Sequence, residues 1–264
     1  MSFRWVIGAI TLFTVVLLIA PTAIVLITSF TDGFSLKFPP EKYSGRWYLE
    51  LLKSDQIIDT ALTSLKTAVV ATALSVVLGT LAALAIARST GPLARTLDAL
   101  FMSPMVLPSL ALGLALLMMF SVSGVRLSLW TLSLGHTIIC IPFVIRMVSA
   151  SVQEMNPALL DSSASLGAGA IFTFFNVTLP LIKRGVLAGA FVAFMASFDN
   201  VPVSLFLADA RNEVLPIHLW QIIEASLDVR AAAVSGALVL LTLILMVVME
   251  RIAGISKQVS RTGK

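Results

Sequence analysis

Residues 161–180 read DSSASLGAGAIFTFFNVTLP, a comparatively polar stretch that lies between long apolar runs. The pair before it, Asn156-Pro157, can start a short helix, because a proline at the first helical position gives up only an amide that would have no partner. Gly167 suits the point where that helix ends and the chain turns. Pro180 predicts a second interruption before the next apolar run. The pattern therefore predicts a short helix and turn that connect two apolar segments and can dock against a partner.

The composition of the chain is that of an integral membrane protein. Hydrophobic residues make up 58% of the 264 residues, charged residues only 12%, and the mean hydropathy is +0.99. Such a chain has too little polar surface for a water-soluble globule. A helix crosses a bilayer in about 20 residues, and the apolar runs allow about six crossings. We predict an all-α fold of six transmembrane helices in one domain over residues 1–264, with spans at 5–30, 61–87, 99–121, 128–150, 184–208 and 232–252 and a loop at 151–183.

The distribution of charge predicts the orientation of these spans. With six spans both termini lie on one side, where the segments carry ten basic and four acidic residues. The segments on the opposite side carry seven basic and nine acidic residues, and Lys66 and Asp199 lie inside spans. Cytoplasmic segments of membrane proteins are enriched in lysine and arginine. We therefore expect both termini and the 151–183 loop to be cytoplasmic.

The sequence gives no indication of enzymatic chemistry in this chain. It contains no G-x-x-x-x-G-K-[ST] motif, so it has no loop of the kind that holds nucleotide phosphates. The one cysteine, Cys140, lies in an apolar run and has no partner for a disulfide or a cysteine metal cluster. Basic residues are scattered at the ends of apolar runs instead of forming a patch, which argues against nucleic acid as a partner. We expect no catalytic residue, metal or cofactor here.

Asp199 is the only acidic residue deep in a predicted span. An unpaired charge at that depth costs from about 3 to over 10 kcal/mol, so the carboxylate should face a cavity or a partner. Phe198, Asn200 and Pro202 adjoin it, and the proline removes a backbone hydrogen bond and opens the helix. We predict a broken helix that lines a translocation path and favours a cationic solute. A hydrogen bond from Asp199 to another helix or subunit is the alternative.

Other residues inside the spans have predicted structural roles. Pro104 and Pro108 imply a kink in the third span, which would form a second wall of the path. Gly185 and Gly189 form a G-x-x-x-G motif suited to close helix packing. His136 is expected to be a hydrogen-bonded interior residue in preference to a proton relay.

The stretch at 161–180 resembles the cytoplasmic "EAA" loop of the inner-membrane subunits of bacterial ABC importers. That loop reads E-A-A, three residues, G, nine residues, I-x-L-P; here Asp161-Ser162-Ser163, Gly167 and 177–180 (VTLP) keep both gaps. Asp replaces Glu, two serines replace the alanines, and Val replaces Ile. The resemblance implies a coupling helix that seats on an ATPase subunit, with Leu160 available for burial. It assigns ATPase coupling to Asp161, Ser162, Ser163, Ala164, Leu166, Gly167, Leu179 and Pro180.

Nearly the whole chain is similar to the second permease of spermidine/putrescine-type ABC importers. The segments that carry this similarity are 38–40 (FPP), 46–48 (RWY), 107–108 (LP), 112–114 (LGL), 178–181 (TLPL), 185–190 (GVLAGA) and 197–199 (SFD). The resemblance implies a type I permease in the bacterial inner membrane, with membrane lipid around it. Its implied protein partners are a second similar permease, two ATP-binding cassette subunits that hold ATP and Mg, and a periplasmic substrate-binding protein.

The cargo is less closely defined than the machinery. Asp199 favours a polyamine such as spermidine or putrescine, whereas relatives of this shape also carry aminoethylphosphonate, opines and other amine-containing solutes. An ion-coupled secondary transporter is the alternative from another class. Such a carrier needs coupling-ion groups in its spans and usually an internal repeat, but the sequence shows only Asp199 and no evident repeat.

Overall fold

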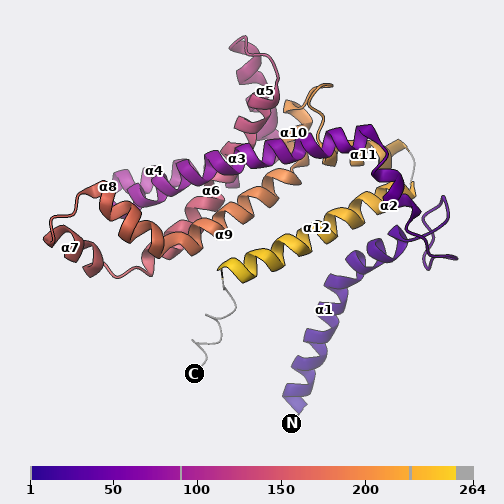
Figure 1. The fold of residues 1–264 in the computed structure, drawn as a ribbon, viewed down its shortest axis with the longest axis horizontal. Coiled ribbons are helices and arrows are strands. Elements are labelled where there is room, and N and C mark those ends of the chain that lie inside the picture. Colours follow the sequence, from indigo (N-terminus) through magenta and orange to yellow (C-terminus); the bar gives the residue numbers. More distant parts are fainter. Residues whose placement is uncertain (1, 90, 226–227, 254–264) are drawn as a thin grey trace. The chain divides into compact units, whose positions relative to one another are not determined.

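The computed structural model describes residues 2–89, 91–225 and 228–253, which fold almost entirely into helices (Figure 1). Within these ranges the extended pairings are two isolated bridges, Thr31 with Tyr43 and Ser35 with Asp228. The predicted all-α class is confirmed. The helices are α1 (Ser2–Ser29), α2 (Arg46–Leu51), α3 (Asp55–Arg88), α4 (Pro92–Val106), α5 (Ser109–Val122), α6 (Leu129–Gln153), α7 (Ala158–Ser165), α8 (Ala170–Thr173), a π-helical turn (Phe174–Thr178), α9 (Leu179–Phe198), α10 (Val201–Leu207), α11 (Leu215–Ala225) and α12 (Val229–Ala253).

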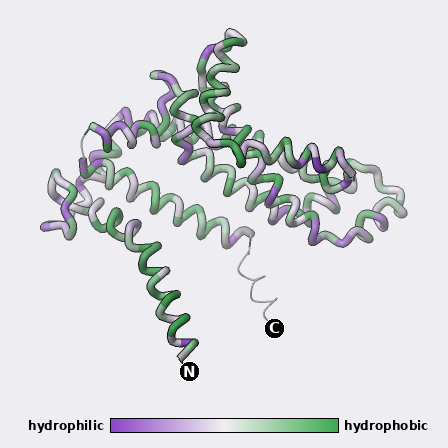
Figure 2. The backbone as a smooth tube through the Cα atoms, turned by 180° about the vertical axis from the view of Figure 1, so that it is seen from behind, coloured by the Kyte–Doolittle hydropathy of each residue, from purple (hydrophilic) through white to green (hydrophobic). Residues whose placement is uncertain are grey.

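Several of these helices are long and apolar enough to cross a membrane. Five described segments qualify, and α4 with α5 makes a sixth if this bent pair is one span. Figure 2 shows how apolar residues line α1 along its length. Lys257, Arg261 and Lys264, which contribute to the predicted orientation, lie outside the described residues. The five segments are Phe3–Ser29, Asp55–Arg88, Leu129–Gln153, Ala170–Phe198 and Val229–Met249.

The predicted third span, 99–121, is wrong as a single helix. α4 ends at Val106, Leu107 is extended with φ −72° and ψ 141°, and α5 begins at Ser109. A proline holds the residue before it in an extended conformation and clashes with the carbonyl four residues earlier, so Pro108 ends the helix. Pro104 remains inside α4. The predicted kink is therefore a break of 105°.

The fifth span begins and ends earlier than the predicted 184–208. Its helical segment runs over Ala170–Phe198, so it starts inside the predicted 151–183 loop. Pro180 does not interrupt it, contrary to the prediction, and lies in the first turn of α9 directly after the π-helical turn. A π turn holds one more residue than an α turn, which displaces the carbonyl that the proline ring would meet. Pro202 does end α9, at Phe198, four residues before it.

The chain divides into two compact units. Among the described residues, the first lies within 1–60 and 218–247, and the second lies within 61–217 and 248–264. In the described residues, the first unit contains α1, α2 and most of α12. The second contains α4 to α10 and most of α3. Both predicted sites, the coupling segment and the break at Asp199, therefore belong to the second unit.

α6 and α9 run side by side and form the core of the second unit (Figure 1). Successive contacts lie four residues apart on α9 and four or seven residues apart on α6, which places them on one face of each helix. A Cβ atom at Gly185 would lie 2.6 Å from the carbonyl oxygen of Met147, so only glycine fits there. The predicted role of the G-x-x-x-G motif in close packing is confirmed. The facing pairs are His136 with Ser197, Cys140 with Ala193, Val144 with Gly189, and Ser151 with Gly185.

α6 also contacts α3 and α10. Ser75 in α3 donates a hydrogen bond to the carbonyl oxygen of Thr137 over 3.2 Å, and a Cβ at Gly79 would lie 2.8 Å from Cβ of Val144. Gly135 faces Val203 and Leu207 of α10. Helices from both sides of each proline break are thus held around one central helix, α6.

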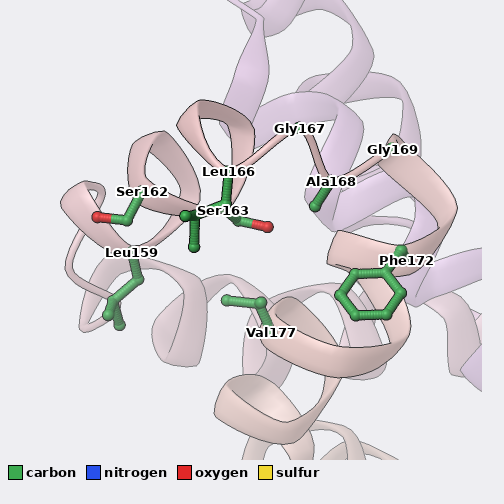
Figure 3. Close-up of a pocket in the computed structure, with 9 residues that line it drawn as sticks. All are labelled: Leu159, Ser162, Ser163, Leu166, Gly167, Ala168, Gly169, Phe172 and Val177. Atoms are coloured by element: carbon green, nitrogen blue, oxygen red, sulfur yellow. The ribbon is translucent and has the colours of Figure 1, made fainter.

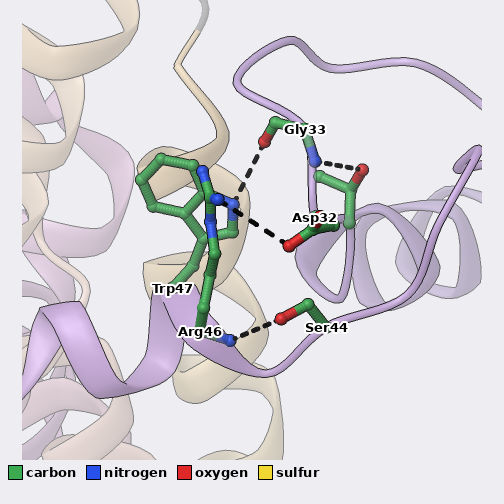
Figure 4. Close-up of polar contacts among 6 residues, drawn as sticks. Asp32, Gly33, Ser44, Arg46 and Trp47 are labelled. Carbon is green, nitrogen blue, oxygen red and sulfur yellow. Dashed lines mark hydrogen bonds and ion pairs between the residues drawn. The ribbon is translucent and has the colours of Figure 1, made fainter.

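The first unit contains a cluster built on Arg46 (Figure 4). The guanidinium carbon lies 4.5 Å from the ring centre of Phe34 and 4.6 Å from that of Trp47. Arg46 Nη1 also lies 3.7 Å from a carboxylate oxygen of Asp32, and Trp47 Nε1 donates to the Gly33 carbonyl over 3.2 Å. Cation–π contacts and the ion pair therefore fix the chain between α1 and α2.

The close contact of α6 with α9 predicts the effect of adding one methyl group. We expect Gly185→Ala to lower the stability of the purified protein by about 1–3 kcal/mol, because the new Cβ forces the backbone of α6 away. Gly8→Ala is the control, since a Cβ at Gly8 meets nothing within 4 Å. The melting temperature in detergent measures the effect. Equal melting temperatures for the two variants would contradict this packing.

Candidate functional site

The predicted coupling segment, residues 156–180, begins with a short helix, α7. The side-chain oxygen of Asn156 accepts a hydrogen bond from the backbone N–H of Ala158 over 3.0 Å, and Pro157 immediately precedes α7. This start agrees with the prediction from Asn156-Pro157. Ser162 and Ser165 donate their hydroxyl protons to carbonyl oxygens of α7 itself. These two hydroxyls are therefore engaged within the helix.

Gly167 ends α7 through a Schellman motif. Its φ is +78°, a left-handed conformation that glycine adopts at little cost. The Gly167 N–H donates to the Ala164 carbonyl over 2.9 Å, and the Ala168 N–H donates to the Ser163 carbonyl over 3.1 Å. These bonds satisfy carbonyls at the helix end and reverse the chain. The predicted turn at Gly167 is confirmed.

A hollow lies between α7 and the start of the fifth span (Figure 3). Its volume is about 640 Å³, and its lining is mostly apolar. Ser163 is buried, and its Oγ lies 2.8 Å from Oγ1 of Thr173, so one hydrogen bond ties α7 to α8. Leu166 is 88% exposed beside this hollow. The lining residues are Leu159, Ser162, Ser163, Leu166, Gly167, Ala168, Gly169, Phe172 and Val177.

The structure brings together only part of the predicted coupling set. Four predicted residues line the hollow, whereas Leu179 and Pro180 belong to α9, and Asp161 and Ala164 are exposed away from its lining. Leu160, expected to be available for burial, is half-buried. The lining residues that were not among the predicted coupling residues are Leu159, Ala168, Gly169, Phe172 and Val177. The apolar run that begins at Ala170 could have indicated Phe172, because this run belongs to a helix and not to a loop.

Four of the predicted pathway residues lie at the break between α9 and α10: Phe198, Asp199, Asn200 and Pro202. Asp199 caps the C-terminus of α9 and is exposed, so it lies at the end of a span and not near the middle. Asn200 caps α10, and its side-chain oxygen accepts the Val203 N–H over 2.9 Å. Phe198 is buried and stacks on Phe194 with ring centres 5.7 Å apart. The predicted break of this helix is confirmed.

A cavity of about 190 Å³ lies where the breaks of α4–α5 and α9–α10 meet. Two predicted pathway residues, Pro104 and Asn200, line it. Pro108 directly precedes α5 and is exposed. Pro202 lies in α10, and its carbonyl oxygen would lie 3.1 Å from a Cβ at Gly113 of α5. The full lining is Pro104, Met105, Ser109, Ile139, Phe143, Ala196 and Asn200.

His136 lies beside this break and is 1% exposed. Its Nδ1 lies 2.8 Å from Oγ of Ser197, and its Nε2 lies 2.9 Å from Oγ of Ser204. Both ring nitrogens are therefore hydrogen-bonded inside the protein, as expected from the sequence.

Neither site has the ligands of a metal centre. Across residues 2–89, 91–225 and 228–253, no group of three or more His, Cys, Asp or Glu side chains could hold a metal ion. The hollow at α7 offers apolar side chains for contact with protein. The cavity at the break combines a hydroxyl, an amide and apolar groups, a surface suited to an organic solute.

The sequence matches a family model described as "Binding-protein-dependent transport system inner membrane component" over residues 75–258. It is 27% identical to the spermidine/putrescine transport system permease protein PotC of Haemophilus influenzae, over 88% of this chain and 90% of that one. It is 28% identical to the putrescine transport system permease protein PotI of Escherichia coli, over 77% of this chain and 74% of that one.

The fold is similar to that of solved importer structures. A chain of a bacterial alginate ABC transporter, crystallised in complex with an alginate pentasaccharide-bound periplasmic protein, superposes with a TM-score of 0.73. The match covers 96% of this chain and 95% of that one, at 14% sequence identity. The predicted type I importer permease architecture is confirmed.

The turn at Gly167 predicts a local effect of a single methyl group. We expect Gly167→Ala to destabilise the Schellman motif by about 1–2 kcal/mol, because an L-residue is strained at positive φ. No atom lies within 4 Å of a Cβ at either Gly167 or Gly169, so Gly169→Ala, at φ −71°, is a matched control. Hydrogen exchange over residues 158–173 should accelerate about tenfold in Gly167→Ala only. Similar exchange rates in both variants would contradict the role of positive φ at Gly167 in ending α7.

Proposed function

This chain belongs to the family of binding-protein-dependent transport system inner membrane components, and from that premise we propose that it is a permease subunit of an ATP-driven polyamine importer. The carrying observation is the exposed apolar hollow at α7, in the segment with importer-loop spacing. An unfilled apolar surface with the exposed Leu166 at its rim is suited to a protein partner. We propose that this partner is an ATP-binding cassette subunit, which holds ATP and Mg.

The coupling segment in this proposal transmits the motion of the ATPase to the fifth span. α7 moves with the ATPase subunit when two such subunits close on ATP. The Ser163–Thr173 hydrogen bond ties α7 to α8, and α8 continues through the π-helical turn into α9. A force on α7 therefore reaches the break at Asp199 along one helical segment. This arrangement requires residues 151–169 and both termini to be cytoplasmic.

The solute in this proposal passes the cavity at the two breaks. α4 and α9 both end there, and the C-terminal end of a helix favours positive charge. Asp199 directly precedes the lining residue Asn200, and its carboxylate forms no ion pair with the described residues. A polyamine, as in the names of the PotC and PotI relatives, fits this charge. A zwitterion such as aminoethylphosphonate or an opine is the second candidate, because Ser109 at the start of α5 adds a helix N-terminus.

The partners follow from the same proposal. The solved alginate transporter includes a periplasmic binding protein, and we propose a periplasmic binding protein for this chain as well. A second permease would complete the pathway, and two ATP-binding cassette subunits would complete the importer. An ion-coupled carrier would instead move solute as this chain alone. Uptake into proteoliposomes that contain only this chain separates the two mechanisms. We expect no uptake if the chain is a permease subunit of an ATP-driven importer.

Leu166→Glu tests the coupling surface. We expect the purified complex to lose its ATPase subunit or its solute-dependent ATP hydrolysis, because burial of a leucine contributes about 1.5–3 kcal/mol and a carboxylate cannot replace it. Leu52→Glu is the control, since Leu52 is also exposed, at 73%, and lies after α2. Retention and coupling equal to the wild type in Leu166→Glu would exclude the hollow as the docking surface.

Asp199→Asn tests the cation pathway. We expect polyamine uptake to fall about 10- to 100-fold while the complex still assembles, because a hydrogen bond to a charged group contributes about 1.5–3 kcal/mol. Asp98→Asn in α4 is the control, since Asp98 lies six residues before the lining residue Pro104, whereas Asp199 adjoins the lining residue Asn200. Uptake per assembled complex is the measurement. A parallel loss of assembly and uptake would assign Asp199 a structural role instead.

A further inference from the structure

One buried imidazole bridges the two arms of the broken fifth span. Ser197 lies at the end of α9 and Ser204 lies within α10, on opposite sides of the pair Asp199-Asn200. His136 of α6 contacts both hydroxyls, at 2.8 Å and 2.9 Å. All three side chains are at most 2% exposed. The imidazole therefore joins three helices at the point where the backbone ladder is interrupted.

The chemistry of the three groups is matched. A neutral imidazole offers one N–H donor and one nitrogen acceptor, and a serine hydroxyl adapts to either by rotating. Each ring nitrogen of His136 thus finds its complement without a charge. Replacing the ring would leave two buried hydroxyls without these partners, which is costly inside a protein.

The backbone alone does not define the angle between α9 and α10. Pro202 has no N–H, and the N–H of Val203 bonds to the side chain of Asn200 and not to a helical carbonyl. The last backbone bond of α9 toward the break runs from the Asn200 N–H to the Ser197 carbonyl over 3.3 Å. Side-chain contacts must therefore supply the remaining restraint across the break.

The bridged residues flank the proposed solute cavity. Ala196 and Asn200 line it, and each is next to or within three residues of Ser197. Ile139 and Phe143 of α6 line the same cavity, and they follow His136 by one and two turns. Any change in the angle between α9 and α10 would move Asn200 and Asp199 relative to these side chains.

We propose that His136 is a positioning residue for solute passage, which fixes the angle of the α9–α10 break through Ser197 and Ser204. It acts through the two serines and needs no contact with the solute. The angle itself is a property of this chain, whereas its effect on passage rests on the proposed transport function. The two parts therefore have separate readouts.

The first readout is the geometry of the break in the assembled complex in lipid. Spin labels at Leu187→Cys in α9 and Leu205→Cys in α10 report the distance across it, and the native Cys140 is buried. We expect His136→Phe, which keeps an aromatic ring, and the Ser197→Ala/Ser204→Ala pair to broaden or shift the distance distribution. Ser133→Ala is the control, because Ser133 is buried in the same helix but bonds only to the Leu129 carbonyl. Distributions identical to the wild type in both variants would overturn the proposal.

The second readout is polyamine uptake by the same complexes. We expect the KM for uptake to rise about tenfold in His136→Phe and in the serine pair, with basal ATP hydrolysis unchanged. Combining the two changes should add little, because both remove the same bridge. An altered distance with an unaltered KM would overturn the link to solute passage. Absence of uptake in the wild-type complex would overturn the proposed function, and the distance measurement would still decide whether His136 fixes the break.

Discussion

The close contact between α6 and α9 is the constraint on which the rest of the second unit depends. Small residues repeat every four positions on α9, so its backbone approaches α6 along its length. α9 has 20 residues and is therefore about 30 Å long. The coupling segment precedes one end of this helix and the break at Asp199 follows the other. In the proposed mechanism, a helix clamped in this way transmits displacement from one site to the other as a rigid element.

Three prolines show why the boundaries of these helices were harder to predict than their existence. Pro108 and Pro202 end the helices before them, whereas Pro180 sits in the first turn of α9. The difference at Pro180 comes from the π-helical turn, which a sequence pattern does not reveal. The start of the fifth span at Ala170 was missed for this reason. Asp199 therefore lies at the end of this span and not at its predicted middle.

The local chemistry of the sites was better predicted than their composition. Asn156, Gly167 and Asn200 act through short-range backbone geometry, and the roles of the first two followed from residue type and spacing. The lining of the hollow depends instead on which face α8 turns toward α7. Phe172 and Val177 could be placed there only once the helix from Ala170 was known. Likewise, the sequence predicted that His136 is hydrogen-bonded, but its two partners lie 61 and 68 residues away along the chain.

We propose that this chain is a polyamine-transporting subunit that a partner ATPase drives. The most direct measurement is ATP hydrolysis by the affinity-purified complex in lipid, with its binding protein, across polyamines, amino acids and aminophosphonates. We expect an ATPase to co-purify and putrescine or spermidine to stimulate it more than the other solutes do. Co-purification of no ATPase would contradict the proposed function and would instead support a self-sufficient carrier.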